Sequence, residues 1–291
     1  MVNEFKQLKL ISEDKPLYNF DNDQTGNDQS LKVYTKDSLI AELRRIRNMG
    51  WISGARHGNV GDVGNTLEDL LGIQENNLPI PNASEWELKC QRVNTTSLVT
   101  LFHSEPSPRA LKFVPSMLLS KYGWPHKKAG SKYSPDEMSF RQTINGQARS
   151  DRGFTVVVDR ESKRVLISFD SNEVASHHGK WLETVAARVG LKELDPQPYW
   201  GFSDLSNKAG SKLLNCFFVQ AEVKRVEEID YYHYSRIMML QGFNIEGLLK
   251  GIEEGYAYID FDARTGHNHG TKFRIRANSL PLLYSSGVII D

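Results

Sequence analysis

The stretch Gly64–Arg92, GNTLEDLLGIQENNLPIPNASEWELKCQR, carries most of what the sequence says about the fold. Its first part predicts a helix beginning at Asn65, because three leucines follow at helical spacing and Asn65 and Glu68 have capping-box spacing. A turn rich in Asn and Pro comes next. EWELKCQRV (85–93) then alternates between polar and apolar residues, which predicts a β-strand.

Glu87 and Lys89 form an E-x-K triplet on this strand. Successive side chains of a strand point to opposite faces, so these two share one face. A carboxylate beside an ammonium is typical of metal-assisted phosphodiester hydrolysis, in which oxygen ligands hold Mg²⁺ and the metal activates a water molecule. Glu68, on the preceding helix, can reach the same metal. The triplet alone also fits an ordinary solvated ion pair.

Other segments of the chain also show regular patterns. TKDSLIAELRRIRNMG (35–50) predicts a helix with Thr35 or Asp37 as its N-cap. SLVTLF (97–102) predicts a strand neighbouring the E-x-K strand, and FTVVVDRESKRVLISFD (154–170) predicts a β-hairpin. The same reasoning predicts helices at 181–190 and 243–255 and strands at 212–226 and 256–264. Together these elements predict an α/β (α+β) fold with a mixed sheet.

Composition narrows the class of protein. The 291 residues fit one large or two small domains, and no apolar run approaches the length of a membrane span. No signal peptide is evident, and two cysteines, Cys90 and Cys216, make neither a disulfide framework nor a four-ligand zinc site. We therefore expect a cytoplasmic protein. The formal net charge is zero, but basic residues outnumber acids two to one over 121–164, so the local distribution of charge decides any nucleic-acid role.

Several motifs occur in an order that is similar to a known family. They are T-x-E-D-L-L at 66–71, N-L-x-x-P at 77–81, E-x-K at 87–89, TLFHSEPSPR at 100–109, YWGFS at 199–203 and the H-x-H-G-T-x-F-R-I block at 267–275. This series resembles the PD-(D/E)xK nucleases and, among them, the MvaI/BcnI restriction endonuclease family, which is related to MutH. The resemblance covers about residues 40–291.

The resemblance implies a restriction-endonuclease-like core, with a central mixed β-sheet flanked by helices, and a DNA-recognition lobe. Residues 1–34 would be an N-terminal extension. Residues 35–195 would form the catalytic core, with a basic hairpin arm at about 120–165. Residues 196–291 would form the recognition lobe and return to the core.

The resemblance also implies roles for four residues of the quoted stretch. Glu87, Lys89, Asn82 and Glu68 would be catalytic, with Asn82 and Glu87 as the metal ligands. The family pattern has Asp at the position of Asn82, and an amide oxygen binds Mg²⁺ without charge. Three readings stay open: a natural variant in which Glu68 or Glu85 supplies the charge, an inactivating Asp→Asn substitution, or a binding-only relative.

Candidate DNA contacts come from the same resemblance. His267 and His269 could hold zinc, but the sequence shows no obvious third ligand nearby, and the family reads base edges with this block. The phosphate-contacting candidates lie in a loop after Ser-Pro and in the glycine-rich loop 53–64. The full set of expected DNA-binding residues is His267, His269, Arg264, Lys272, Arg109, Arg56 and His57.

The function that this implies is a type II restriction endonuclease with Mg²⁺ as its cofactor. It would cut double-stranded DNA at a short CC/GG-type site, as a monomer by default or as a dimer, and would pair functionally with a cognate DNA methyltransferase. Two alternatives stay open: a MutH-like strand-specific nicking endonuclease, and a catalytically disabled sequence-specific DNA-binding relative.

Overall fold

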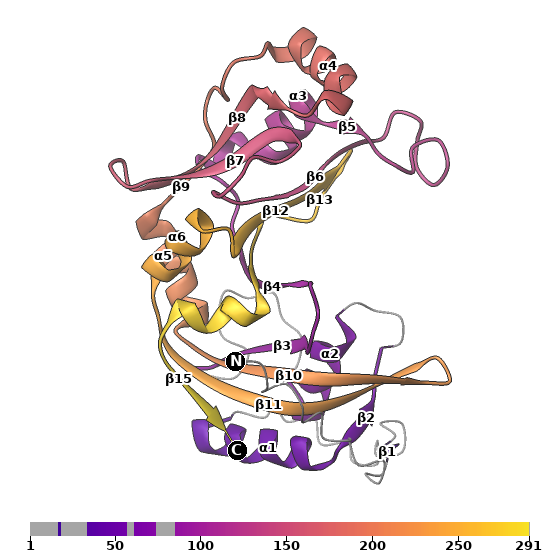
Figure 1. Ribbon diagram of the computed structural model, residues 1–291, viewed down its shortest axis with the longest axis vertical. Helices are drawn as coiled ribbons and strands as arrows, with labels where there is room; N and C mark the ends of the chain where they lie inside the picture. The colour runs from indigo at the N-terminus through magenta and orange to yellow at the C-terminus, as the bar shows by residue number, and fades with distance from the viewer. Residues whose placement is uncertain (1–16, 19–33, 57–60, 74–84, 291) are drawn as a thin grey trace, which may run out of the picture.

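The computed structural model describes residues 17–18, 34–56, 61–73 and 85–290. Within these ranges the strands form two six-stranded sheets and one three-stranded sheet. Figure 1 shows two lobes: one around β3, β10 and β11, and another around β7 and β8, with β4 and β12 running between them. The protein therefore has the mixed α/β architecture that the sequence predicts.

The first sheet carries the E-x-K triplet on its edge strand. Its strand order is β1-β2-β11-β10-β3, and β15 pairs with the far half of β11. β3 runs parallel to β10, whereas β10 and β11 are antiparallel, so the sheet is mixed. The strands are β1 (Leu17–Tyr18), β2 (Trp51–Ser53), β3 (Glu87–Arg92), β10 (Asn215–Val226), β11 (Ile229–Phe243) and β15 (Tyr284–Ile290).

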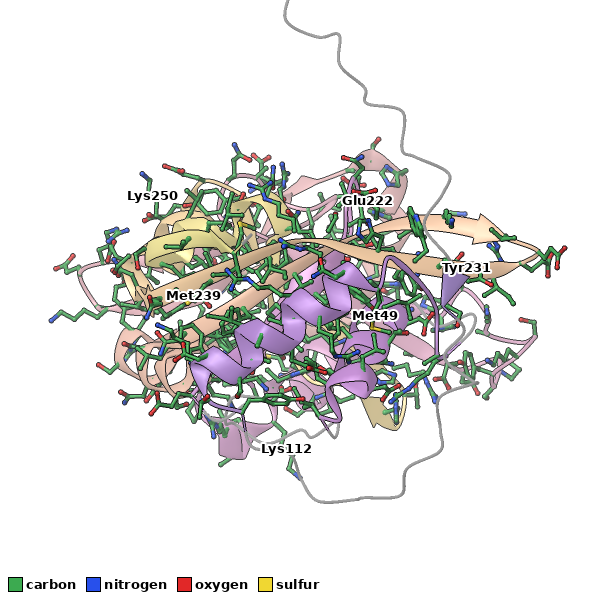
Figure 2. The ribbon with its side chains drawn as sticks, turned by 90° about the horizontal axis from the view of Figure 1, so that it is seen from below. Met49, Lys112, Glu222, Tyr231, Met239 and Lys250 are labelled. Atoms are coloured by element: carbon green, nitrogen blue, oxygen red, sulfur yellow. The ribbon has the colours of Figure 1, made fainter. Side chains whose placement is uncertain are left out.

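Two helices, α1 (Lys36–Asn48) and α2 (Asp62–Leu71), pack against this sheet. Figure 2 shows α1 lying across the sheet between the labelled Met49 and Met239. Its buried leucines and isoleucine join Phe217 and Val219 of β10 in one apolar cluster. Because side chains alternate along a strand, this packing occupies the face of β10 that Phe217 and Val219 share, and it leaves the opposite face to Cys216 and Phe218.

The second sheet has the order β4-β14-β12-β6-β5, with β13 on β12. One of its faces buries Phe140, Phe261 and Phe273 in the larger core cluster, whereas the other carries charged residues. The strands are β4 (Leu98–His103), β5 (Trp124–Pro125), β6 (Met138–Ile144), β12 (Ala257–Arg264), β13 (His267–Asn268) and β14 (Lys272–Arg276).

The third sheet and the remaining helices complete the fold. The hairpin of β7 and β8 pairs with β9, and α4 packs beside β8 (Figure 1). α5 leads directly into β10 of the first sheet. These elements are β7 (Arg152–Asp159), β8 (Arg164–Val174), β9 (Tyr199–Gly201), α3 (Ser120–Tyr122), α4 (Gly179–Val189), α5 (Phe202–Leu213) and α6 (Ile245–Glu253), with short η helices at 109–111, 114–119, 176–178 and 277–283.

The structure confirms the helix over 35–50, where Thr35 and Ser38 form a capping box, and the hairpin over 154–170. Three expectations are wrong. The strand predicted over 212–226 begins only at Asn215, because Lys212 and Leu213 form the end of α5. α2 begins at Asp62, not Asn65, because Asp62 is buried in the first turn by specific hydrogen bonds. β4 lies in the second sheet and pairs with β14, because the short connection after β3 carries the chain from one sheet to the other.

Both large sheets contain strands from both of the predicted ranges, 35–195 and 196–291, and the first sheet also contains β1 from the predicted N-terminal extension. β10, β11 and β15 join the sheet of β3, and β4 and β6 join the sheet of β12. The assignment of catalysis to one range and DNA recognition to the other stays a prediction.

Asp62 fixes the start of α2 to the first sheet. Its carboxylate, 2% exposed, accepts hydrogen bonds from the Tyr232 hydroxyl at 2.8 Å, the Thr66 hydroxyl at 3.2 Å and the Arg56 backbone N–H at 2.7 Å. A buried carboxylate requires such donors because water is excluded. Burial and Asp62 both raise the pKa of Tyr232, so its hydroxyl keeps the proton that it donates.

We expect Gly54→Ala to destabilise the protein by about 1–3 kcal/mol, because the added Cβ would overlap Asp62 Oδ2 and the Tyr232 ring. Gly64→Ala is the matched control: its Cβ would lie 4.0 Å from Cys90 Cβ, inside a helix. That change should be neutral or stabilising by up to about 1 kcal/mol. Urea unfolding of both variants measures the difference, and equal stabilities would contradict this account of Gly54.

Candidate functional site

The E-x-K triplet lies at the start of β3. Glu87 is 1% exposed, and Lys89 Nζ lies 2.6 Å from Glu87 Oε1, so the two side chains share one face as the sequence predicts. This face also carries Cys216 and Phe218, which pair with Glu87 and Lys89 across β10. A buried carboxylate is stabilised only by charge partners or hydrogen-bond donors, and Lys89 supplies both.

A second ammonium reaches the same carboxylate from α5. Lys212 Nζ lies 3.7 Å from Glu87 Oε1, and Lys208 precedes it by one helical turn. Burial, Arg109 and Lys212 together lower the pKa of Lys208, which places Arg109 beside this group. Neither lysine is among the candidates that the sequence motifs indicate. Their i, i+4 spacing marks one face of α5, but the sequence pattern predicts a strand from residue 212, and nothing in it indicates that this face meets Glu87.

His103, at the end of β4, lies next to this group of cations. It pairs in register with Lys272 of β14. Burial is the largest cause that lowers its pKa, followed by the charges of four lysines. Those lysines are Lys272, Lys212, Lys208 and Lys89. Lysines of β3, α5 and β14 therefore surround His103 with positive charge, and two of them, Lys89 and Lys212, also contact the buried Glu87. A polyanion is the ligand that such a field favours.

Glu68 lies next to β3, but beside Cys90. Burial and then the charge of Glu68 raise the pKa of the Cys90 thiol. Cys90 points away from the face of Glu87 and Lys89 by strand alternation. β3 is an edge strand, so side chains from either face of the sheet can lie near its free edge. The role of Glu68 as a metal ligand stays a prediction, and Asn82 lies outside the described residues.

The other expected DNA-binding residues divide into exposed and paired groups. His267 and His269 are exposed at the β13 turn, with ring centroids 4.3 Å apart. Arg264 is held by Glu137 at 2.9 Å and stacks over the Tyr133 ring. Arg56 pairs with Asp69 at 3.3 Å, Lys272 lies 3.9 Å from Asp262, and His57 is outside the described residues.

The polar face of the second sheet carries a row of ion pairs that the sequence motifs do not indicate. Arg274 lies 3.2 Å from Asp260, and Arg141 lies 3.0 Å from Asp262 on the neighbouring strand. Thr143 donates to Asp260 at 2.7 Å. Strand alternation along β12 indicates that Asp260 and Asp262 share one face. It does not indicate their arginine partners, which lie on β14 and β6, 14 and 121 positions away in the chain.

Another group of potential metal ligands lies in the other lobe. Over the described ranges, Asp151, His177 and His178 are the cluster whose ligand atoms come within 4.8 Å of one another. Asp151 and His177 are exposed, and none of the three belongs to the sheets that hold Glu87 and the ion-pair row. This cluster therefore supplies no ligand to the Glu87 site.

The mixed sheet, with a buried Glu-Lys pair on its edge strand beside a cationic cluster, has the form of a restriction-endonuclease core. The model of the MvaI/BcnI restriction endonuclease family matches residues 40–284. The chain belongs to this family, whose members are type II site-specific deoxyribonucleases. This confirms the resemblance seen in the sequence motifs.

Solved structures with a similar fold agree with the family. The restriction endonuclease MvaI in complex with its cognate DNA substrate aligns with a TM-score of 0.70 and 24% identity, over 89% of this chain and 100% of that chain. MvaI in the absence of DNA aligns with a TM-score of 0.51 and 24% identity, over 90% and 100% of the two chains. A search of curated protein sequences gives no match.

A helix that crosses a bilayer must be both long and apolar along most of its length. Among the residues that the structure describes, no helix meets both requirements.

The lowered pKa of His103 is directly measurable. We expect its imidazole to titrate below 6.5 in the folded protein, so that it is neutral at pH 7. Lys272→Met should move the midpoint upward, because it removes the largest charge contribution that disfavours the imidazolium. NMR titration of the His103 ring measures both values, with Lys250→Met as the control. A midpoint above 6.5, or one that is the same in Lys272→Met as in the parent protein, would show that the cations do not converge on His103.

Proposed function

We propose that this chain hydrolyses double-stranded DNA at a short site built on CC and GG, with Mg²⁺ as its cofactor. The observation that carries the proposal is the buried Glu87 carboxylate, which is held by Lys89 and Lys212 within a cationic cluster. An ordinary solvated ion pair on a strand would be exposed, and it would need neither a second ammonium nor a neutral imidazole beside it.

The donor chemistry of the site fits Mg²⁺. Glu87 offers carboxylate oxygens, which are the ligands that this ion prefers, and Asn82 would add an uncharged amide oxygen. Glu68 would be the auxiliary carboxylate. When bound, Mg²⁺ supplies an activated water and neutralises charge on the phosphate.

The lysines of the site have separate tasks in this proposal. Lys89, already hydrogen-bonded to Glu87, would orient the attacking water beside the carboxylate. Lys212 and Lys208 would hold the scissile phosphate, whose charge increases in the transition state. Arg109, beside Lys208, would contact the next phosphate. A neutral His103 can both donate and accept a hydrogen bond in the DNA groove.

The ion-pair row of the second sheet would read the bases. Arginine pairs with the O6 and N7 atoms of guanine, and a carboxylate accepts from the N4 amino group of cytosine. Arg274–Asp260 and Arg141–Asp262 present both partners at the distance of one ion pair. Such pairs can be exchanged for hydrogen bonds to a G·C base pair, so that neither the guanidinium nor the carboxylate is left without a hydrogen-bond partner, which favours a site rich in G·C. The exposed His267 and His269 would extend this surface.

The protein's context follows from the same proposal. An enzyme that cuts a short site also cuts the DNA of its own cell, so a cognate methyltransferase must protect that site. We place both activities in the cytoplasm, and we propose that the chain acts as a monomer that cuts the two strands in turn.

Cleavage of plasmid DNA in Mg²⁺ tests the catalytic assignment. Glu87→Gln and Lys89→Ala should each lower the rate at least about 100-fold, because each removes a group that acts on the reacting atoms. Lys250→Ala removes an equal charge from an exposed position on α6, where the lysine pairs with Glu254, and should cut normally. Sequencing the ends identifies the site.

Asn82→Asp separates the readings of that position. Equal cutting by the parent and Asn82→Asp shows that the amide suffices. Cutting by Asn82→Asp alone shows that Asn82 disables an otherwise complete site. Nicks confined to one strand would instead support the MutH-like alternative, and binding without cutting by either protein would support the binding-only relative.

Base recognition is tested with duplexes that differ at one position, in Ca²⁺ to prevent cleavage. Arg274→Ala should reduce discrimination at one G·C pair by about 1–3 kcal/mol, which is roughly 5- to 150-fold, because alanine cannot make the bidentate hydrogen bonds to guanine. Arg160→Ala is the control, since Arg160 pairs with Glu246 and Glu253 of α6 away from the sheet face. An even reduction of affinity for all duplexes would make Arg274 a phosphate-binding residue instead.

A further inference from the structure

A hollow of about 820 Å³ lies where the two large sheets meet, at the far end of β3 from Glu87. Its walls are the connection from β3 to β4 at residues 93–97, the middle of β10 and β11, and the ends of β12 and β14. The lining residues include Arg236 of β11 and Arg276 of β14 but, among those that the structure describes, neither Asp nor Glu. The proposed cleavage mechanism uses none of them.

The two arginines are exposed and present their charge to this hollow. Arg276 donates from Nε to the Tyr258 hydroxyl at 2.8 Å, which holds the guanidinium plane against one wall. In the described part of the chain, neither Arg236 nor Arg276 forms an ion pair, in contrast to Arg274 and Arg141 of the second sheet. A third arginine of the lining, Arg92, is already engaged by Tyr232 and lies 3.6 Å from Asp230.

The remaining lining side chains are mostly neutral hydrogen-bonding groups. Amides and hydroxyls face the hollow from both walls: Asn94, Thr95, Thr96, Ser97, Gln220 and Asn278. Two cations surrounded by neutral donors, without a competing carboxylate, favour an anion with several acceptor oxygens, and arginine matches the geometry of phosphate bidentately.

The hollow lies on the same face of the first sheet as the E-x-K triplet. Glu87 pairs with Cys216 and Gln91 pairs with Gln220, so Gln220 follows Glu87 along this face by four residues. At the rise of a β-strand, this separation is about 13 Å. Duplex DNA advances about 3.4 Å per base pair, so a duplex that runs along β3 places about four base pairs between the level of Glu87 and that of Gln220.

We infer that Arg236 and Arg276 form a second phosphate-binding site, which holds the DNA backbone about four base pairs from the scissile phosphate. The inference rests on the proposed function, since it takes duplex DNA as the ligand. The site fixes the register of the duplex over Glu87 and carries no sequence information, because it binds phosphate oxygens only.

Salt-dependent binding tests this site. The Arg236→Ala/Arg276→Ala double variant should bind cognate and unrelated duplexes more weakly by the same factor, in Ca²⁺. Its slope of log K against log salt concentration should fall by about 0.9 for each phosphate that is no longer neutralised. The Arg236→Lys/Arg276→Lys variant should recover most of the slope. Arg44→Ala, on the exposed side of α1, removes a charge from the opposite face of the sheet and should leave the slope unchanged.

A series of duplexes, each with one neutral methylphosphonate linkage at a different position, locates the phosphate that the two arginines bind. For the parent protein, one neutral linkage about four base pairs from the cut should weaken binding, and for the double alanine variant the same linkage should cost nothing further. An unchanged salt slope in the double variant would overturn the inference, and so would a weakening confined to the cognate duplex.

Two further outcomes separate the causes of failure. Calorimetry with inorganic phosphate tests a free anion as the ligand: saturable binding that is absent from the double variant, with an unchanged salt slope for DNA, would overturn the assignment to the DNA backbone. Failure of the parent protein to cut DNA that it binds would count against the proposed function, whereas the comparison of slopes would still decide the phosphate site.

Discussion

The burial of one carboxylate, Glu87, constrains the rest of this structure. An ionised group that is 1% exposed needs cations in fixed positions, and Lys89 and Lys212 supply them from a strand and a helix that lie over 100 residues apart in the chain. Lys212 reaches Glu87 because α5 runs directly into β10, and β10 pairs in parallel with β3. The parallel pairing of these two strands thus assembles the site, and the core on the opposite face of the sheet keeps both strands in register.

Charge is distributed over the two sheets in two different ways. Around Glu87, cations are in excess, and their charges add to the effect of burial in lowering the pKa of His103. On the polar face of the second sheet, each acid has a basic partner nearby. The first arrangement attracts a polyanion regardless of sequence, and the second offers donors and acceptors in fixed pairs. A chain with zero net charge can therefore present a strongly cationic surface, because the balancing acids lie elsewhere.

Much of the local structure follows from patterns within ten to twenty residues. The face shared by Glu87 and Lys89 needs only the period of a strand, and the capping box of α1 needs only Thr35 and Ser38. The start of α2 was misplaced because Asp62 depends on Tyr232, which lies 170 residues away. β4 was assigned to the wrong sheet because two strands in succession along the chain do not have to pair.

Short motifs and their order are enough to predict the class of fold, the family and the E-x-K pair. Which other side chains meet that pair depends on how distant elements pack together. Lys208, Lys212 and His103 join it, and Arg264 turns instead to Glu137. The physical reason is that strand and helix periods fix the direction of a side chain relative to its own element, whereas electrostatic partners are set by how the elements pack.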